Sequence, residues 1–165
     1  MEISLFTKCL FEFIGTLVLV LLGDGVVAST VLKRSKGFDG GWIVITIAWG
    51  LAVMCGVLIA GPYSGAHLNP AVSVGLAVAG SFPWAYVPGY VAAQLLGGFC
   101  GAVVVYLYYK DHFDATDDPA AKLGVFCTMP AIMDKPRNLF CEVVGTFLLV
   151  FVILAIGNEQ NTPEI

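Results

Sequence analysis

Charged residues are scarce in this sequence of 165 residues: lysine, arginine, aspartate and glutamate together make up 12% of it, whereas hydrophobic residues make up 58%. The formal net charge is −4 and no basic stripe runs along the chain, which argues against nucleic-acid binding. The mean hydropathy of +0.87 lies well outside the range of soluble domains. The composition therefore indicates a membrane protein.

The cysteines of this sequence also lack the spacing that is typical of metal ligands. Four of the five cysteines lie within or at the edge of apolar segments, and no metal-site spacing occurs among Cys9, Cys55, Cys100, Cys127 and Cys141. This pattern favours packing thiols over a disulfide pair or metal ligands. The apolar segments also contain no pair of a nucleophile and a base, so we expect neither an enzyme nor a metal or other cofactor.

Four apolar segments are long enough to cross a membrane. They cover residues 8–32, 42–60, 84–109 and 138–157. Each approaches or exceeds the ~20 residues that a membrane-spanning helix needs. The first has the position of a signal peptide, but it is long, contains Glu12 and Asp24, and lacks an Ala-x-Ala cleavage site. We therefore interpret it as a span.

A polar break lies between the second and third segments. Residues 64–73, with the sequence SGAHLNPAVS, are too few to cross a bilayer. We expect an irregular run over residues 61–68 and a short helix over residues 69–79, because Asn69 is a favoured N-cap residue and Pro70 fits the first helical position. Irregular backbone at membrane depth is tolerated only where it is buried in protein or lines a wet cavity. The break therefore predicts a polar path through the protein.

The chain contains an internal repeat. The sequence EFIGTLVLV at residues 12–20 aligns with EVVGTFLLV at residues 142–150. An odd number of spans in the first unit would invert the second unit in the membrane, as in many transport proteins. We therefore expect a first repeat over residues 1–137, ending in a long polar loop over residues 110–137. The first span of a second repeat then covers residues 138–165.

Several motifs in this sequence resemble those of a known family. The run HLNPAVS at residues 67–73 resembles the first Asn-Pro-Ala box of the major intrinsic proteins, the aquaporins and glycerol facilitators. The Glu-x-x-Gly-Thr motif at Glu12, the run AWGLAV at residues 48–53 and the pair Ala93-Gln94 are similar to the same family, in the same order. The resemblance implies an all-α membrane protein, an aquaporin-like inverted-repeat helical bundle with a re-entrant half-helix. The family's second box and sixth span do not occur here, so we expect a truncated bundle of four spans plus one half-helix that forms no selective pore alone.

The break is expected to carry the chemistry of the pore. The Asn69 side-chain amide has two N–H donors for a passing hydroxyl. The resemblance implies that the carbonyls of residues 65–68 form a ladder of acceptors, and the positive end of the half-helix opposes cations. The Asn-Pro-Ala motif consists of Asn69, Pro70 and Ala71. The residues expected along the pore are Trp49, Val53, Gly65, Ala66, His67, Leu68, Asn69 and Leu149.

Three polar residues are expected to support the pore loops: Glu12, Gln94 and Glu142. One interpretation of Glu12 is a charge at a helix end, near Lys8. We favour a buried carboxylate that accepts N–H bonds from the re-entrant loop, because the repeat places Glu142 identically and a second loop could use it. Gln94 is interpreted as a donor to the first loop or as an interhelical hydrogen-bonding group. His67 is interpreted as a structural donor rather than a metal ligand or proton relay.

Trp49 bears on the substrate, because it lies inside the second span and away from the interface where tryptophan is common. Tryptophan at this position resembles the glycerol facilitators, and its broad apolar face suits the carbons of a polyol. Val53, one turn on, extends the same face. We therefore expect a passive channel for glycerol and related small neutral solutes, with water as a second permeant. The alternatives are a water-selective aquaporin and, less favoured, a gated secondary transporter, since no carboxylate cluster accompanies Glu12 and Asp24.

Small residues recur every four positions along two spans. They are Gly89, Ala93, Gly97 and Gly101 in the third span, and Ala52, Gly56 and Ala60 in the second. Such stripes let membrane helices approach closely, either within a subunit or between subunits. The family implies a homotetramer that crosses the plasma membrane several times and contacts lipid. It also implies a cytoplasmic N-terminus, whereas the distribution of basic residues favours the reverse orientation.

Overall fold

The computed structural model describes residues 3–157, and the regular elements in that range are all helices. They are α1 (Leu5–Val31), α2 (Gly41–Ser64), α3 (Pro70–Val78), the 3₁₀ turn η1 (Trp84–Tyr86), α4 (Val87–Tyr108), α5 (Lys110–Ala115), α6 (Pro119–Gly124) and α7 (Lys135–Ile156). Four segments are long and apolar enough to cross a membrane, namely α1, α2, η1 with α4, and α7. The predicted spans and the all-α membrane fold are therefore confirmed.

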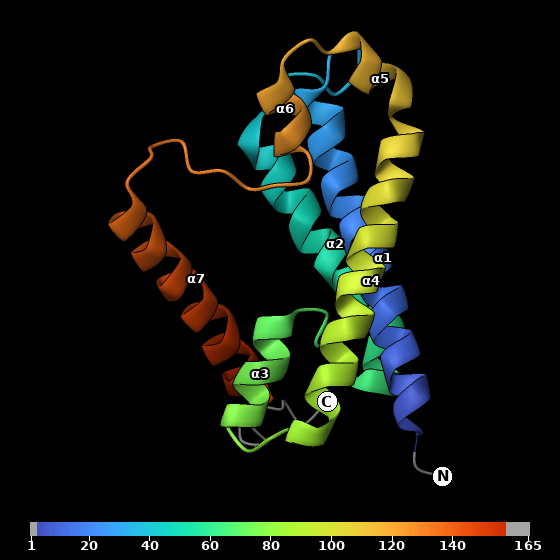
Figure 1. The fold of residues 1–165 in the computed structure, drawn as a ribbon, viewed down its shortest axis with the longest axis vertical. Helices are drawn as coiled ribbons and strands as arrows, with labels where there is room; N and C mark the ends of the chain where they lie inside the picture. The colour runs from blue at the N-terminus through green and yellow to red at the C-terminus, as the bar shows by residue number, and fades with distance from the viewer. Residues whose placement is uncertain (1–2, 158–165) are drawn as a thin grey trace.

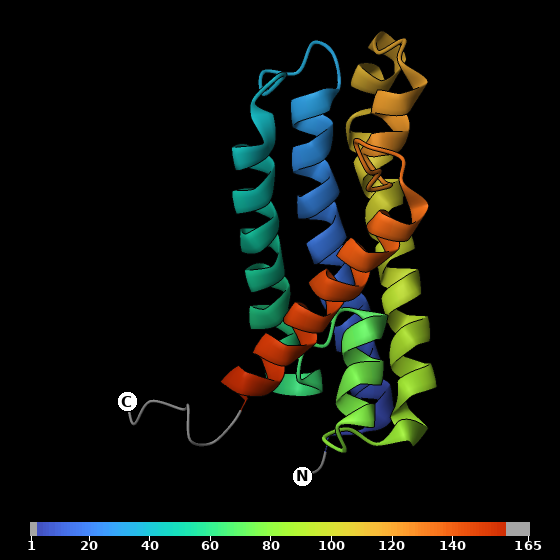
Figure 2. The ribbon, with the colours of Figure 1, turned by 90° about the vertical axis from the view of Figure 1, so that its left-hand side faces the viewer.

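The helices α1, α2 and α4 run side by side along the long axis of the molecule, and α1 contacts both of the others (Figure 1). The short helix α3 lies beside the first half of α4, while α7 crosses obliquely and contacts α3 (Figures 1 and 2). Large apolar side chains such as Leu58, Phe99 and Phe147 are exposed on the outer faces. Apolar surface of this extent is typical of a protein that contacts lipid.

Small residues allow α1 to lie close to its two neighbours. A methyl group at Gly97 of α4 would overlap the backbone of Phe13 in α1. On the other side, a methyl group at Gly56 of α2 would lie 3.0 Å from the carbonyl oxygen of Gly15. Close backbone approach of this kind is the usual role of small residues in membrane helices. The two stripes of small residues therefore pack against α1 within the subunit.

We expect Gly97→Ala to destabilise the protein by about 1–3 kcal/mol, because the added methyl group meets helix backbone that cannot rotate away. Thermal unfolding of the detergent-solubilised protein would measure the change. Gly50→Ala is the matched control, since a methyl group at this position of α2 has no atom within 4 Å. Alanine also favours a helix more than glycine does, so the control should unfold at the same temperature or slightly higher. Equal unfolding temperatures for the two variants would contradict the packing described here.

The helix α2 extends further than the sequence predicts. The irregular run is expected from Gly61 onward, but α2 continues through Pro62 to Ser64. A proline in the last turn removes few hydrogen bonds and is tolerated there. The helix ends instead at Gly65, which has a left-handed φ of 85° and donates its N–H to the Gly61 carbonyl. The irregular stretch is thus confined to residues 65–69, where the chain turns back into the molecule before α3 begins (Figure 1).

Only part of residues 110–137 forms the exposed loop that the sequence predicts: residues 127–133 are irregular and exposed, whereas the preceding residues fold into short helices. The helices α5 and α6 fold over the end of the bundle that lies opposite the N-terminus (Figures 1 and 2). There Phe113 and Val125 are buried against Ala28, Leu32 and Val105. Two apolar side chains in an otherwise polar segment are enough to anchor it, because each removes a large area from water. We call this folded segment, residues 110–126, the cap.

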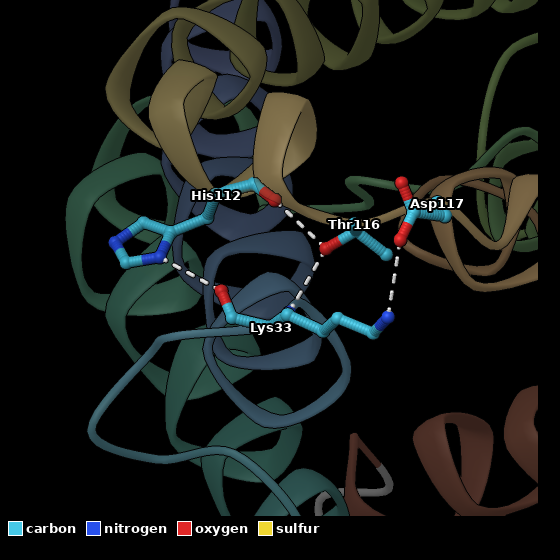
Figure 3. Close-up of polar contacts among 4 residues, drawn as sticks. All are labelled: Lys33, His112, Thr116 and Asp117. Atoms are coloured by element: carbon cyan, nitrogen blue, oxygen red, sulfur yellow. Dashed lines mark hydrogen bonds and ion pairs between the residues drawn. The ribbon is translucent and has the colours of Figure 1, made fainter.

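Polar contacts tie the cap to Lys33, two residues beyond the end of α1 (Figure 3). The Lys33 N–H donates to Thr116 Oγ1 at 2.9 Å, and the Thr116 hydroxyl donates to the His112 carbonyl at 2.7 Å. His112 Nδ1 lies 3.1 Å from the Lys33 carbonyl oxygen, and Lys33 Nζ lies 3.3 Å from Asp117. His112, expected in a loop, therefore belongs to α5 and contacts backbone.

The last described helix begins three residues before the predicted boundary at residue 138. The Asp134 side chain accepts the Arg137 N–H and caps α7, so Lys135 is its first residue. Residues 158–165 of the predicted second unit lie outside the described residues. The boundary moves because the sequence estimate follows hydropathy, which does not register a capping carboxylate.

Candidate functional site

Glu12 lies at the centre of the site that the re-entrant loop forms. Its side chain is fully buried in α1. Oε1 accepts the His67 N–H at 2.9 Å and the Ser64 hydroxyl at 2.6 Å. Oε2 accepts the Leu68 N–H at 2.8 Å and a Gln94 side-chain N–H at 2.8 Å. These donors replace water around a buried carboxylate, and they join α1 to α2, to α4 and to the loop.

The loop turns its carbonyl oxygens away from Glu12. The N–H groups of Ala66, His67 and Leu68 point to Ser64 Oγ or to the Glu12 carboxylate. The C=O and N–H of a trans peptide unit point in opposite directions, so the carbonyls of residues 65–67 point the other way. None of the residues in the range 3–157 donates a hydrogen bond to the carbonyls of residues 65–68. These oxygens are therefore available to a solute.

The loop backbone is strained, and its side chains hold it in place. Ala66 and Leu68 have left-handed φ values of 50° and 54°, a conformation that costs a non-glycine residue about 1–3 kcal/mol. The Leu68 side chain is wedged between α1 and α2. Methyl groups added at Gly15 and Gly56 would come within 2.6 Å and 2.8 Å of it. The buried leucine and the Glu12 contacts together stabilise the strained conformation.

Asn69 begins α3, with Pro70 at the first turn, as the sequence predicts. Its Oδ1 accepts the Ala71 N–H at 2.8 Å. This bond fixes the orientation of the amide and leaves Nδ2 without a hydrogen-bond partner in the described part of the chain. Two N–H donors thus lie beside the row of unpaired carbonyls. The helix covers Pro70–Val78, close to the predicted 69–79.

Gln94 makes no hydrogen bond to the loop backbone itself. Its Nε2 donates to Glu12, as described above, and also to Ser73 Oγ at 3.0 Å. Ser73 Oγ lies 2.9 Å from His67 Nδ1. Gln94 therefore acts on the loop through Glu12 and through Ser73, and it links α4 to α1 and α3.

Several contact residues were not predicted from the sequence. The Tyr90 hydroxyl donates to the Ser64 carbonyl at 2.8 Å, and the rings of His67, Phe82 and Tyr90 pack against one another. Serine, tyrosine and phenylalanine are common in membrane helices, so their identity carries little signal. Tyr90 lies one turn before Gln94 on the same face of α4, and that spacing could have indicated it.

A cavity of about 780 Å³ lies between α1, α2 and the residues that end the cap. Trp49 lines this cavity, and its ring packs on α1 at Gly23, where a methyl group would come within 2.5 Å of the ring. Val53 and Leu149 do not line it, and each is 43% exposed. This cavity thus includes Trp49 alone of these three side chains, and the pore role of Val53 and Leu149 stays a prediction. Glu142 is exposed on α7 and hydrogen-bonds to no other described side chain.

The site consists of a re-entrant loop, a buried carboxylate that fixes it and a half-helix that begins at it, and membrane-length helices surround all three. This arrangement is typical of a membrane protein with a polar path. The chain belongs to the major intrinsic protein family: the family model described as Major intrinsic protein matches residues 1–164. It is thus a multi-pass membrane protein, in agreement with the resemblance found in the sequence.

Three similar proteins illustrate the relationship. The chain is 57% identical over 151 residues to the probable glycerol uptake facilitator protein of Thermotoga maritima, covering 92% of this chain and 64% of that protein. It is 52% identical over 151 residues to the glycerol uptake facilitator protein of Bacillus subtilis, covering 92% and 55%. The solved structure of the Plasmodium falciparum aquaglyceroporin superposes with a TM-score of 0.65 at 39% identity, covering 71% of this chain and 48% of that one. The chain thus spans 55–64% of the length of the two facilitators.

Proposed function

We propose that the intact protein is a channel, not an enzyme, for passive diffusion of glycerol and related small neutral solutes, with water as a second permeant. The observation that carries this proposal is the row of unpaired carbonyls at residues 65–68 next to the Asn69 amide. A hydroxyl group that passes this row exchanges water partners for protein partners. The free energy then changes little along the path, which permits fast movement without tight binding. The names of the similar proteins support the same substrate.

Trp49 supports glycerol over water as the preferred substrate. A polyol carries hydroxyls on one side and carbons on the other, and Trp49 offers its carbons an apolar wall in the cavity. In a water-selective channel, which is the alternative interpretation, a broad apolar ring would contact no solute carbons.

We also propose that the protein is a homotetramer in the plasma membrane, in line with the family. The helix α1 occupies the small-residue stripes, which leaves the outer faces of α2 and α4 free for other contacts.

The direct test is a stopped-flow swelling assay on proteoliposomes that contain the intact protein. We expect glycerol to enter much faster than into protein-free vesicles. The uptake should not saturate with glycerol concentration, should not depend on an ion gradient and should not be accompanied by proton leakage. Uptake that requires an ion gradient would favour a secondary transporter. Water flux without glycerol flux would favour a water-selective aquaporin.

We expect Trp49→Phe, combined with a bulkier polar residue at Ile45 in the same cavity wall (Ile45→Gln), to shift permeability from glycerol towards water. The smaller ring gives less apolar contact to the polyol carbons, while the added amide binds water. The ratio of the two permeabilities in one vesicle preparation measures the shift. Leu58→Gln, on the exposed outer face of α2, is the control that should leave this ratio unchanged. A double variant with the wild-type ratio would contradict the role given to Trp49.

A further inference from the structure

Asp24 is a buried carboxyl group that the re-entrant loop does not use. It lies further along α1 than Glu12 and is 8% exposed. It lines the cavity of about 780 Å³, as do Val27 and Val31 on the same face of α1. Trp49 lines the same cavity from α2. Asp24 therefore shares a cavity with Trp49, the residue that supports glycerol as the substrate.

The carboxyl of Asp24 has no partner in the described part of the chain. No residue in the range 3–157 hydrogen-bonds or ion-pairs with it. The neighbouring hydroxyls do not compensate, because Thr30 Oγ1 donates to carbonyls of its own helix, as does Thr46 Oγ1. Its oxygens are not among the side-chain atoms sealed inside the described part of the chain, so they face the cavity that Asp24 lines. Asp24 is therefore poised to accept a hydrogen bond from a molecule inside the cavity.

The surroundings favour an uncharged ligand with hydroxyl groups. A metal ion needs several ligands, and among the described residues no three His, Cys, Asp or Glu side chains gather. The cavity is otherwise largely apolar near Asp24, where Val27, Ile45 and Trp49 line it. A polyol satisfies both kinds of surface, because one hydroxyl can donate to the carboxyl while the carbons contact the apolar wall. A carboxyl group keeps an acceptor oxygen for this purpose in either protonation state.

We propose that Asp24 is a specificity-determining residue of the cavity, whose carboxyl oxygen accepts a hydrogen bond from a polyol that lies against Trp49. This inference rests on the proposed glycerol channel and adds a polyol-binding position ahead of the Asn69 loop. It distinguishes glycerol from water because water needs no fixed orientation and loses little without this acceptor.

The test compares glycerol and water permeability of the intact protein in proteoliposomes, normalised to the amount of protein inserted. Asp24→Val removes the acceptor while keeping a similar shape. The loss of one hydrogen bond should lower glycerol permeability about three- to tenfold, with water permeability changed by less than about twofold. Asp24→Asn keeps one oxygen acceptor and should stay within about twofold of the wild-type ratio. Asp24→Ala, which replaces the carboxyl-bearing side chain with a methyl group, provides a second acceptor-free variant if the valine variant does not insert.

The outcomes distinguish a failure of the role given to Asp24 from a failure of the proposed glycerol channel. An unchanged ratio of glycerol to water in the valine and alanine variants would overturn the role of Asp24, and so would a parallel fall of both permeabilities. Wild-type vesicles that pass no glycerol would instead overturn the proposed function, and with it this inference. Asp111→Asn, an exposed carboxyl on α5 outside the cavity, is the control that should keep the wild-type ratio.

Discussion

Glu12→Ala should destabilise the intact protein by at least about 3 kcal/mol and abolish glycerol flux. The substitution leaves the N–H groups of His67 and Leu68, the Ser64 hydroxyl and the Gln94 amide without their acceptor. Each buried donor left unsatisfied costs about 1–3 kcal/mol. The left-handed conformations of the loop then lose the contacts that stabilise them. Thermal unfolding in detergent and vesicle swelling measure the two effects.

Two further variants serve as comparisons for Glu12→Ala: one keeps the shape of Glu12 without its charge, and the other is a surface control. Glu12→Gln preserves the shape but turns N–H donors towards other donors, so we expect a loss between those of the wild type and the alanine variant. Asp111→Ala removes an exposed carboxyl from α5 and should change stability by less than about 0.5 kcal/mol. If Glu12→Ala unfolds at the same temperature as Asp111→Ala, the carboxylate does not hold the loop.

Asn69→Leu should abolish permeation while the protein still inserts in the membrane. Leucine lacks the two N–H donors that lie beside the carbonyl row, and its branched side chain occupies their place. It also removes the N-cap of α3, which costs about 1 kcal/mol. Swelling assays at equal protein density should therefore give a glycerol flux close to that of protein-free vesicles.

Asn69→Asp distinguishes the donor from the cap. Aspartate still accepts the Ala71 N–H and caps α3, but it offers no N–H to a solute. We expect the unfolding temperature of the wild type together with a strong loss of glycerol flux. Full conductance in this well-folded variant would show that the Asn69 donors are dispensable.

The fold was largely predictable, because the four spans follow from hydropathy alone and α3 follows from an Asn-Pro start. The cap was not. Residues 110–137 are polar on average, and that average hides Phe113 and Val125, whose burial against α1 and α4 folds the segment. The end of α2 was misplaced for a related reason. The sequence analysis starts the irregular run at Gly61, whereas the left-handed Gly65 ends the helix.

Those contacts of the site were predictable that follow from the chemistry of a single residue. A glutamate in an apolar span demands donors, and the structure places the N–H groups of His67 and Leu68 around Glu12. Ser64, Ser73 and Tyr90 make contacts that depend on how three helices meet, which their identities do not reveal. Helical spacing places Trp49 and Val53 on a common face of α2, and the pore role of Val53 stays a prediction, because the cavity includes only Trp49.

The orientation of the loop also determines which molecules it can recognise. Because Glu12 and Ser64 occupy the N–H groups of residues 66–68, the loop shows only oxygen acceptors on its other side. A small ketone, ether or sulfoxide carries oxygen but no hydrogen to donate, so it would lose its hydration there and gain nothing from those carbonyls. Alcohols and amides of similar size carry such hydrogens. Along this stretch we expect the proposed channel to favour solutes that can donate a hydrogen bond.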